Sequence, residues 1–129
     1  MKRILIVDDD AVVRELLTQV LHEQYTVVVA CNGAEALDSI RDRRPDAIVL
    51  DMMMPVMDGW TFLRARRGEP EFAKIPVMVV SGEPQACQDG KRLGALACVP
   101  KPFDIDSLLS AVWRLVRPAD QTDGGGQMV

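Results

Sequence analysis

Apolar residues follow two alternating patterns along this chain. Five short runs are almost continuously apolar or β-branched, as in buried strands, and they lie at residues 4–7, 26–30, 47–50, 77–80 and 97–100. The segments between them carry apolar residues at helical spacing; the first segment places Val13, Leu16, Leu17, Val20 and Leu21 on one face. Five successive repeats of strand and helix predict an α/β fold with a parallel sheet and right-handed crossovers.

Residues typical of helix starts support these boundaries. An aspartate or asparagine before the first turn accepts hydrogen bonds from amides that have no partner inside the helix. Asp10, Asp58 and Asp104 stand at such positions, and Asn32 followed by Glu35 has the pattern of a capping box. Each of these four residues therefore predicts that a helix begins directly after it.

The fourth predicted helix is the weakest of the set. Pro84 suits its first turn, since the ring of proline is compatible with that position. Gly90 and Gly94 limit its length, because glycine is less stable in a helix than other residues. We expect a short helix here, followed by a brief fifth strand.

The length of the chain, 129 residues, is enough for one domain with a single hydrophobic core. The repeats of strand and helix occupy residues 1–117. Residues 118–129 are polar and rich in glycine, which predicts a flexible C-terminal tail and no output domain in this chain.

Four of the five predicted strands end on a reactive polar group. The first strand leads into Asp8 and Asp9, and the third leads into Asp51. The fourth is followed by Ser81, and the fifth by Lys101. The carboxyl ends of parallel strands line one crevice, where ligands of open α/β sheets bind. The sequence therefore predicts that three carboxylates, a hydroxyl and an ammonium group lie close together.

This combination of groups favours phosphoryl chemistry. At about 4 Å and an effective dielectric constant near 20, two carboxylates repel by on the order of 4 kcal/mol, so a cluster raises a pKa or recruits a cation. Oxygen ligands of this kind suit Mg²⁺. An aspartate is also a competent nucleophile toward phosphorus. Asp51 is the candidate nucleophile, with Lys101 and Ser81 as partners of the phosphoryl oxygens.

Composition excludes several other classes of function. The net charge of −4 is the reverse of the basic surface of nucleic-acid-binding proteins. The N-terminal apolar run is too short for the core of a signal peptide and is followed by acidic residues, and no run reaches the about 20 apolar residues that a membrane span needs. We therefore expect a cytoplasmic protein that binds neither nucleic acid nor membrane.

The cysteines and the histidine supply no recognisable metal site. Cys31, Cys87 and Cys98 form no paired motif and His22 is the single histidine, so a zinc site is poorly provided for. For a cytoplasmic protein the simplest expectation is that all three cysteines are reduced thiols.

Taken together, the motifs resemble the receiver domain of two-component response regulators. The matching segments are Ile-Val-Asp-Asp at 6–9, Asp-Met-Met-Met-Pro-Val-Met-Asp-Gly at 51–59, Val-Ser-Gly at 80–82 and Lys-Pro-Phe at 101–103. The resemblance covers about residues 2–117. It implies a flavodoxin-like, doubly wound (βα)5 fold with strand order 2-1-3-4-5.

The resemblance also implies a metal site. Asp9, Asp51 and the backbone carbonyl of Met53 would ligate Mg²⁺ or Mn²⁺, and Asp8 would act through a water molecule. Met53 further occupies the position at which the family tunes attack by water on the phosphoryl group. Its apolar side chain is expected to shield that group and to lengthen its life.

By the same resemblance, Asp51 accepts a phosphoryl group from the phosphohistidine of a sensor histidine kinase or of a histidine phosphotransfer protein, or from a small acyl phosphate. Lys101 would pair with the phosphoryl oxygens. Ser81 would shift toward them and thereby remodel the surface of the fourth helix, the fifth strand and the last helix. A downstream protein would read this surface, so the chain is a signalling phosphoacceptor rather than a turnover enzyme. We expect a monomer or a weak, phosphorylation-dependent dimer.

One position departs from the family pattern. The family usually has an aromatic residue three positions before the lysine, where it follows the hydroxyl residue inward on activation; here that switch position is Cys98. A cysteine does not fill the space of a ring. We therefore expect a weakly coupled switch with modest structural change on activation.

Two other readings of the sequence stay open at this stage. In a haloacid-dehalogenase-like phosphatase, Asp8 would be the nucleophile and Asp10 the general acid, but Asp51 would then have no role. In a phosphorylation-independent interaction module with the receiver fold, the partner would bind regardless of Asp51.

Overall fold

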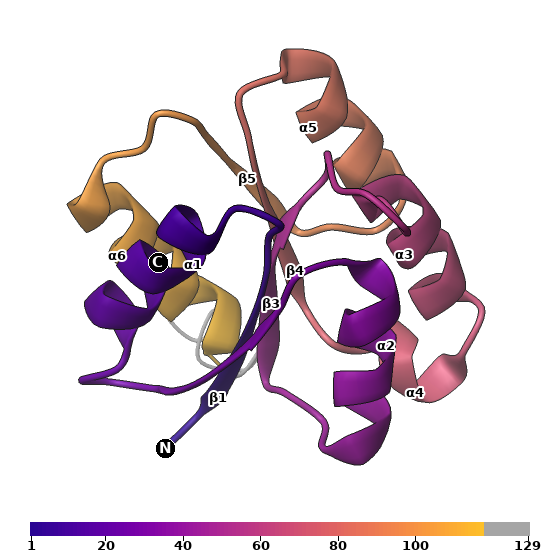
Figure 1. The fold of residues 1–129 in the computed structure, drawn as a ribbon, viewed down its shortest axis with the longest axis horizontal. Coiled ribbons are helices and arrows are strands. Elements are labelled where there is room, and N and C mark those ends of the chain that lie inside the picture. Colours follow the sequence, from indigo (N-terminus) through magenta and orange to yellow (C-terminus); the bar gives the residue numbers. More distant parts are fainter. Residues whose placement is uncertain (118–129) are drawn as a thin grey trace, which may run out of the picture.

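A five-stranded parallel sheet forms the centre of the protein (Figure 1). The computed structural model describes residues 1–117; the predicted tail at 118–129 lies outside these residues. The strands lie side by side in the order β2-β1-β3-β4-β5, which confirms the predicted flavodoxin-like topology. Their bounds are β1 (Arg3–Val7), β2 (Thr26–Ala30), β3 (Ala47–Asp51), β4 (Val77–Ser81) and β5 (Ala97–Pro100).

Helices cover both faces of the sheet. Helices α1 and α6 lie on one face, and α2, α3 and α5 lie on the other (Figure 1). The short helix α4, in the connection between α3 and β4, is an element that the sequence analysis missed because four residues show no periodicity. The helix bounds are α1 (Ala11–Leu21), α2 (Gly33–Asp42), α3 (Gly59–Arg67), α4 (Pro70–Ala73), α5 (Pro84–Arg92) and α6 (Ile105–Val116).

Successive residues of the central strands pack against opposite faces, so the sheet divides the core into two clusters. Ile48 and Leu50 of β3 pack in the cluster under α2, α3 and α5, whereas Val49 packs in the cluster under α1 and α6. Every residue of β3 and β4 is buried, as expected of strands covered on both sides. The carboxyl ends of these strands are therefore held firmly in place.

All four predicted helix caps are confirmed. Asp10 accepts from the Val12 amide at 2.9 Å, Asn32 from Glu35 at 2.9 Å, Asp58 from Thr61 at 2.8 Å and Asp104 from Ser107 at 3.0 Å. The capping box differs in one detail, since the Glu35 carboxylate accepts from the amide of Cys31 instead of that of Asn32. These bonds fix where each helix begins after its strand.

The expectation that all three cysteines are free thiols is wrong for two of them. Cys87 of α5 and Cys98 of β5 form a disulfide, with Cα atoms 5.7 Å apart, and Cys31 is the free cysteine. The α5 crossover returns the chain to β5 and brings the two residues together. Their 11-residue separation matches no recognised spacing motif, so this pairing could not be predicted from the sequence.

One expectation about the first helix also needs correction. Leu16 belongs to the apolar stripe of α1, yet 39% of its surface is exposed, and Val12 is exposed to 75%. Leu17 and Leu21 make the buried contacts of this helix.

No helix among residues 1–117 has both the length and the apolar character needed to cross a membrane.

Gly90 has a packing role beyond its effect on helix length. A Cβ atom at Gly90 would lie 2.8 Å from Cγ2 of Val79, so the glycine lets α5 approach β4 closely. We expect Gly90→Ala to lower the free energy of unfolding by about 1 kcal/mol or more, because overpacking outweighs the gain in helix propensity. Urea denaturation followed by circular dichroism measures this difference.

Gly68→Ala is the matched control for this prediction. A Cβ atom at Gly68 would lie 3.5 Å from the Ala65 carbonyl oxygen, an ordinary contact, and the Gly68 φ of −76° suits any residue. Gly68→Ala should therefore change the free energy of unfolding by no more than about 0.5 kcal/mol. Equal stability of Gly90→Ala and Gly68→Ala would contradict the packing argument.

Candidate functional site at the carboxyl ends of the strands

The predicted polar groups lie at one edge of the sheet. Asp8 and Asp9 directly follow β1, Asp51 is the last residue of β3, Ser81 is the last residue of β4, and Lys101 directly follows β5. Hydrogen bonds continue the sheet to this edge, since the Lys101 amide donates to the Ser81 carbonyl at 2.9 Å. Parallel pairing of β1, β3, β4 and β5 thus brings residues distant in sequence into one site.

Three carboxylates form the centre of the site. One carboxylate oxygen each of Asp8, Asp9 and Asp51 can be chosen so that all three lie within 4.8 Å of one another. The side chains of Asp8 and Asp51 are buried, whereas Asp9 is exposed. Such a group of hard oxygen ligands, open to solvent on one side, fits a divalent cation of the Mg²⁺ type.

Among the described residues, Lys101 is the cation that forms ion pairs with the carboxylates of this cluster. Its Nζ atom lies 3.5 Å from Oδ2 of Asp8 and 3.9 Å from Oδ1 of Asp51. One ammonium group therefore faces two buried carboxylates, and the cluster keeps a net negative charge. That excess charge is what a divalent cation would neutralise.

Burial and like charge raise the pKa values of Asp8 and Asp51. The pKa of Asp51 rises to about 6, first because burial disfavours its ionised form and second because of the neighbouring charge of Asp8. Burial also raises the pKa of Asp8, although a hydrogen bond from the Asp10 amide and the charge of Lys101 oppose this. The Met53 amide donates to Oδ1 of Asp51 at 3.3 Å and partly stabilises its charge.

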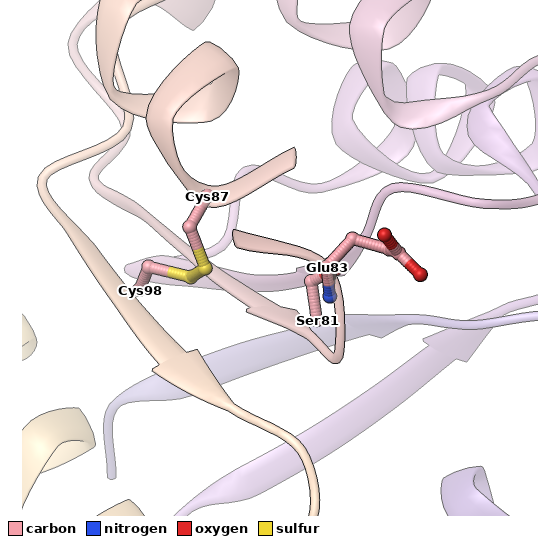
Figure 2. Close-up of a disulfide and its surroundings, with 4 residues drawn as sticks. All are labelled: Ser81, Glu83, Cys87 and Cys98. Carbon is pink, nitrogen blue, oxygen red and sulfur yellow. Dashed lines mark hydrogen bonds between the residues drawn. A yellow bond between two sulfur atoms is a disulfide. The ribbon is translucent and has the colours of Figure 1, made fainter. Parts of the chain in front are cut away.

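The hydroxyl of Ser81 has a partner in the loop that leads into α5. Ser81 is buried, and its Oγ atom accepts a hydrogen bond from the Glu83 amide at 3.0 Å. Cys98 lies beside Val79 in the register of β4 and β5, and its half-buried side chain packs against the cluster under α2, α3 and α5. Figure 2 shows Cys98 joined to Cys87 near Ser81 and Glu83.

Sequence reasoning missed three features around the site. The Trp60 indole N–H donates to Oδ2 of Asp89 at 2.9 Å and joins α3 to α5. Trp60 also lines an open hollow with Asp9, Met53, Met54, Pro55 and Asp58. Apolar residues near the acidic loops are exposed as well, among them Met53 at 60% and Val56 at 85%. The sequence contains one sign of this exposure, since Met53 and Val56 belong to no predicted helix or strand.

The family model of the response regulator receiver domain matches residues 4–113. This chain belongs to the response regulator receiver domain family. The receiver domain is a signalling module of two-component response regulators. The chain is 41% identical over 112 residues to the sporulation initiation phosphotransferase F of Bacillus subtilis. The matched region covers 86% of this chain and 90% of that protein.

The chain is also similar to part of a longer response regulator and to a solved receiver domain. The chain is 40% identical over 128 residues to the response regulator MprA of Mycolicibacterium vanbaalenii. This match covers 97% of the chain but 54% of that protein. The chain thus spans about half the length of that regulator. A solved receiver domain of the sensor histidine kinase PA1611 from Pseudomonas aeruginosa has a TM-score of 0.82 at 25% identity, covers 89% of this chain and 97% of its own, and holds a magnesium ion in its active site cleft.

The hydrogen bond of Asp10 argues against the interpretation as a haloacid-dehalogenase-like phosphatase. A general acid needs a carboxyl group free to reach the substrate. Asp10 instead uses a carboxylate oxygen to cap α1 through the Val12 amide. Together with membership of the receiver family, this leaves the haloacid-dehalogenase interpretation without support.

The raised pKa of Asp51 predicts a pH-dependent stability. The folded protein binds the Asp51 proton more tightly than the unfolded chain. The free energy of unfolding is therefore greatest with Asp51 protonated, and it falls as pH rises from the ordinary aspartate pKa of 3.8 through the raised pKa of about 6. Above this range the ionised carboxylate destabilises the fold by up to about 3 kcal/mol. Asp51→Asn, in chelator at about pH 7.5, should therefore unfold at a higher temperature than wild type, with the difference shrinking toward about pH 4.

Asp38→Asn is the control for a general change of charge. The Asp38 side chain is 83% exposed, and an exposed ion pair such as that of Asp38 with Arg41 contributes little. Thermal unfolding curves over the pH range compare the two variants. A melting temperature of Asp51→Asn equal to that of wild type at neutral pH would refute the destabilising role of the ionised carboxylate.

Proposed function

We propose that this receiver domain accepts a phosphoryl group on Asp51, with Mg²⁺ bound beside it, and thereby switches a protein-interaction surface on α5, β5 and α6. The observation that carries the proposal is the convergence of Asp51, its acidic neighbours and Lys101 at one edge of the sheet. Family membership supports the same function. In this view the chain is a phosphoacceptor and not an enzyme that turns over an external substrate.

The acidic cluster fits a magnesium ion. Asp9 and Asp51 would ligate it directly, Asp8 through water, and the backbone carbonyl of Met53 would complete the protein ligands; Mn²⁺ would be accepted by the same oxygens. When bound, the ion neutralises charge on the carboxylates and on the phosphoryl oxygens. The protein's own contribution is to hold two buried carboxylates close together before the ion arrives.

Asp51 acts as the nucleophile toward phosphorus. A carboxylate oxygen of Asp51 forms a P–O bond while the P–N bond of a donor phosphohistidine breaks, and the leaving imidazole takes up a proton. The product is an aspartyl phosphate. Lys101, already 3.9 Å from Oδ1 of Asp51, is placed to pair with a phosphoryl oxygen and to stabilise the charge in the transition state.

Ser81 connects this chemistry to the surface of the protein. Its hydroxyl accepts from the Glu83 amide, and Glu83 precedes the first turn of α5. When the hydroxyl turns to donate a hydrogen bond to the phosphoryl group, this contact with Glu83 is lost. The start of α5 then adopts a different position, and a downstream protein distinguishes the two forms.

Exposed apolar residues around the acidic loops suit a protein donor. Val12 and Leu16 lie on α1, which begins just after Asp8–Asp10, and Val56 lies in the loop after Asp51. A phosphohistidine must come within bonding distance of Asp51, so its protein has to cover this region. We infer that a sensor histidine kinase or a histidine phosphotransfer protein packs an apolar helix face against these residues.

Acetyl phosphate provides a direct test of the acceptor. Wild type incubated with acetyl phosphate and Mg²⁺ should gain one phosphoryl group by intact-protein mass spectrometry, and the adduct should be absent in chelator and in Asp51→Asn. Asp58→Asn is the matched control, because asparagine preserves the cap of α3 and Asp58 is not assigned to the chemistry.

Two results would contradict the proposal in different ways. An adduct that persists in Asp51→Asn would place the acceptor on another carboxylate, such as Asp8. Absence of any adduct on wild type, together with no binding of beryllofluoride, would favour a phosphorylation-independent interaction module.

Met53 is expected to lengthen the life of the phosphorylated state. Its side chain is apolar and 60% exposed, and its amide contacts Asp51, so it lies where water approaches the aspartyl phosphate. Met53→Asn should accelerate loss of the phosphoryl group several-fold, since a polar side chain can orient the attacking water. The rate is measured by mass spectrometry after removal of acetyl phosphate.

Val56→Asn is the control, since it adds the same polar group at another exposed site of the same loop. An unchanged dephosphorylation rate in Met53→Asn, or equal acceleration in both variants, would argue against a specific role of Met53.

A further inference from the structure

The disulfide between Cys87 and Cys98 joins two elements of the proposed switch surface. Cys87 lies in the first half of α5, and Cys98 lies in β5 beside Val79 of β4 (Figure 2). Both residues are half-buried. Cys31, the third cysteine, lies in the connection between β2 and α2 and takes no part in this pairing.

A short series of contacts links the disulfide to Ser81. The Ser81 hydroxyl accepts from the Glu83 amide at 3.0 Å, and the Glu83 carbonyl accepts from the Cys87 amide at 3.2 Å. Cys87 is then bonded to Cys98. A movement of Ser81 that releases Glu83 therefore acts on the turn of α5 that the disulfide holds against β5.

The remainder of α5 is already fixed by other contacts. Asp89 accepts a hydrogen bond from Trp60 of α3, and Gly90 packs closely against Val79 of β4. Residues 82–85, by contrast, are exposed. Ala86, which follows them, is buried in the core. Residues 82–85 are thus the part of this region with the fewest constraints, and the disulfide at Cys87 holds the turn of α5 that follows them.

We propose that Cys87 and Cys98 form a redox site that sets how strongly phosphorylation of Asp51 is coupled to the surface of α5 and β5. The disulfide form restricts displacement of residues 82–87, and the dithiol form permits it. This inference rests on the proposed function, because it requires that Ser81 responds to the group on Asp51.

The redox step is a thiol–disulfide exchange with a low-molecular-weight disulfide such as oxidised glutathione. The thiolate of one cysteine attacks a sulfur of the small disulfide and releases one thiolate, leaving a mixed disulfide on the protein. The second cysteine then attacks the protein sulfur of that mixed disulfide and releases a second thiolate. Two electrons pass from the cysteine pair to the small disulfide, and the two protons lost by the cysteines appear on the released thiols.

Thermodynamic linkage makes the proposal quantitative. If the disulfide opposes the activated conformation, it weakens binding of a phosphoryl mimic at Asp51, and the mimic must favour the dithiol by the same factor. Coupling of this kind typically changes affinity about fivefold or more. Two independent measurements therefore have to agree.

The experiment uses the whole chain in two redox states, with beryllofluoride and Mg²⁺ as the phosphoryl mimic. Alkylation and mass spectrometry define the states: the oxidised protein has Cys31 as its alkylated residue, and the reduced protein is alkylated at all three cysteines. Beryllofluoride affinity is measured by NMR titration. Hydrogen exchange of the amides in 82–87 is measured with and without the mimic.

Reduced protein should bind beryllofluoride about fivefold or more tightly than oxidised protein, and its exchange at 82–87 should respond more strongly. In a glutathione buffer, the mimic should shift the pair toward the dithiol by the same factor. Cys87→Ser and Cys98→Ser should behave like reduced wild type in both buffers. Cys31→Ser should keep the full redox response, because it leaves the pair intact.

The outcomes separate this inference from the proposed function. Equal affinity and equal exchange in both redox states, with beryllofluoride bound in each, would overturn the redox site and leave phosphorylation at Asp51 intact. Failure of the pair to oxidise, or a redox response retained in Cys87→Ser, would overturn it as well. Beryllofluoride that binds in neither state would refute the proposed function, and the redox inference with it.

Discussion

Repulsion between the carboxylates of Asp8, Asp9 and Asp51 is the constraint on which the rest of the structure depends. Their ligand oxygens lie within 4.8 Å of one another, and Lys101 offsets only part of the charge. The cluster persists because its aspartates directly end or follow strands whose other residues are packed on both sides. Apolar contacts throughout the sheet thus hold the acidic groups where electrostatics alone would separate them.

Much of this arrangement could be predicted from the sequence, because it depends on local signals. Continuous apolar runs are typical of strands covered on both faces, and the polar residue after each run marks the edge at which ligands bind. Caps such as Asp58 and Asp104 are equally local, since the side chain bonds to an amide three residues later. The positions of Asp51 and Lys101 at the site follow from these signals, although their chemical roles do not.

Features that depend on contacts between elements were beyond sequence reasoning. Leu16 has the spacing of a core residue, but it is partly exposed, and Leu17 and Leu21 make the buried contacts of α1. The link from Cys87 to Cys98 requires knowing how α5 lies over β5, and the hydrogen bond from Trp60 to Asp89 requires knowing that α3 lies beside α5. Periodicity identifies one face of an element; it does not identify the neighbour that this face meets.

The loop after β1 divides three consecutive aspartates between two tasks. Asp8 and Asp9 belong to the acidic cluster, whereas Asp10 caps α1. Asp8 also accepts from the Asp10 amide, so the two tasks share one turn of backbone. If the loop lost or gained one residue, an aspartate could no longer cap α1 while the two before it reach the acidic cluster. The two tasks together therefore fix the length of this loop as well as its aspartates.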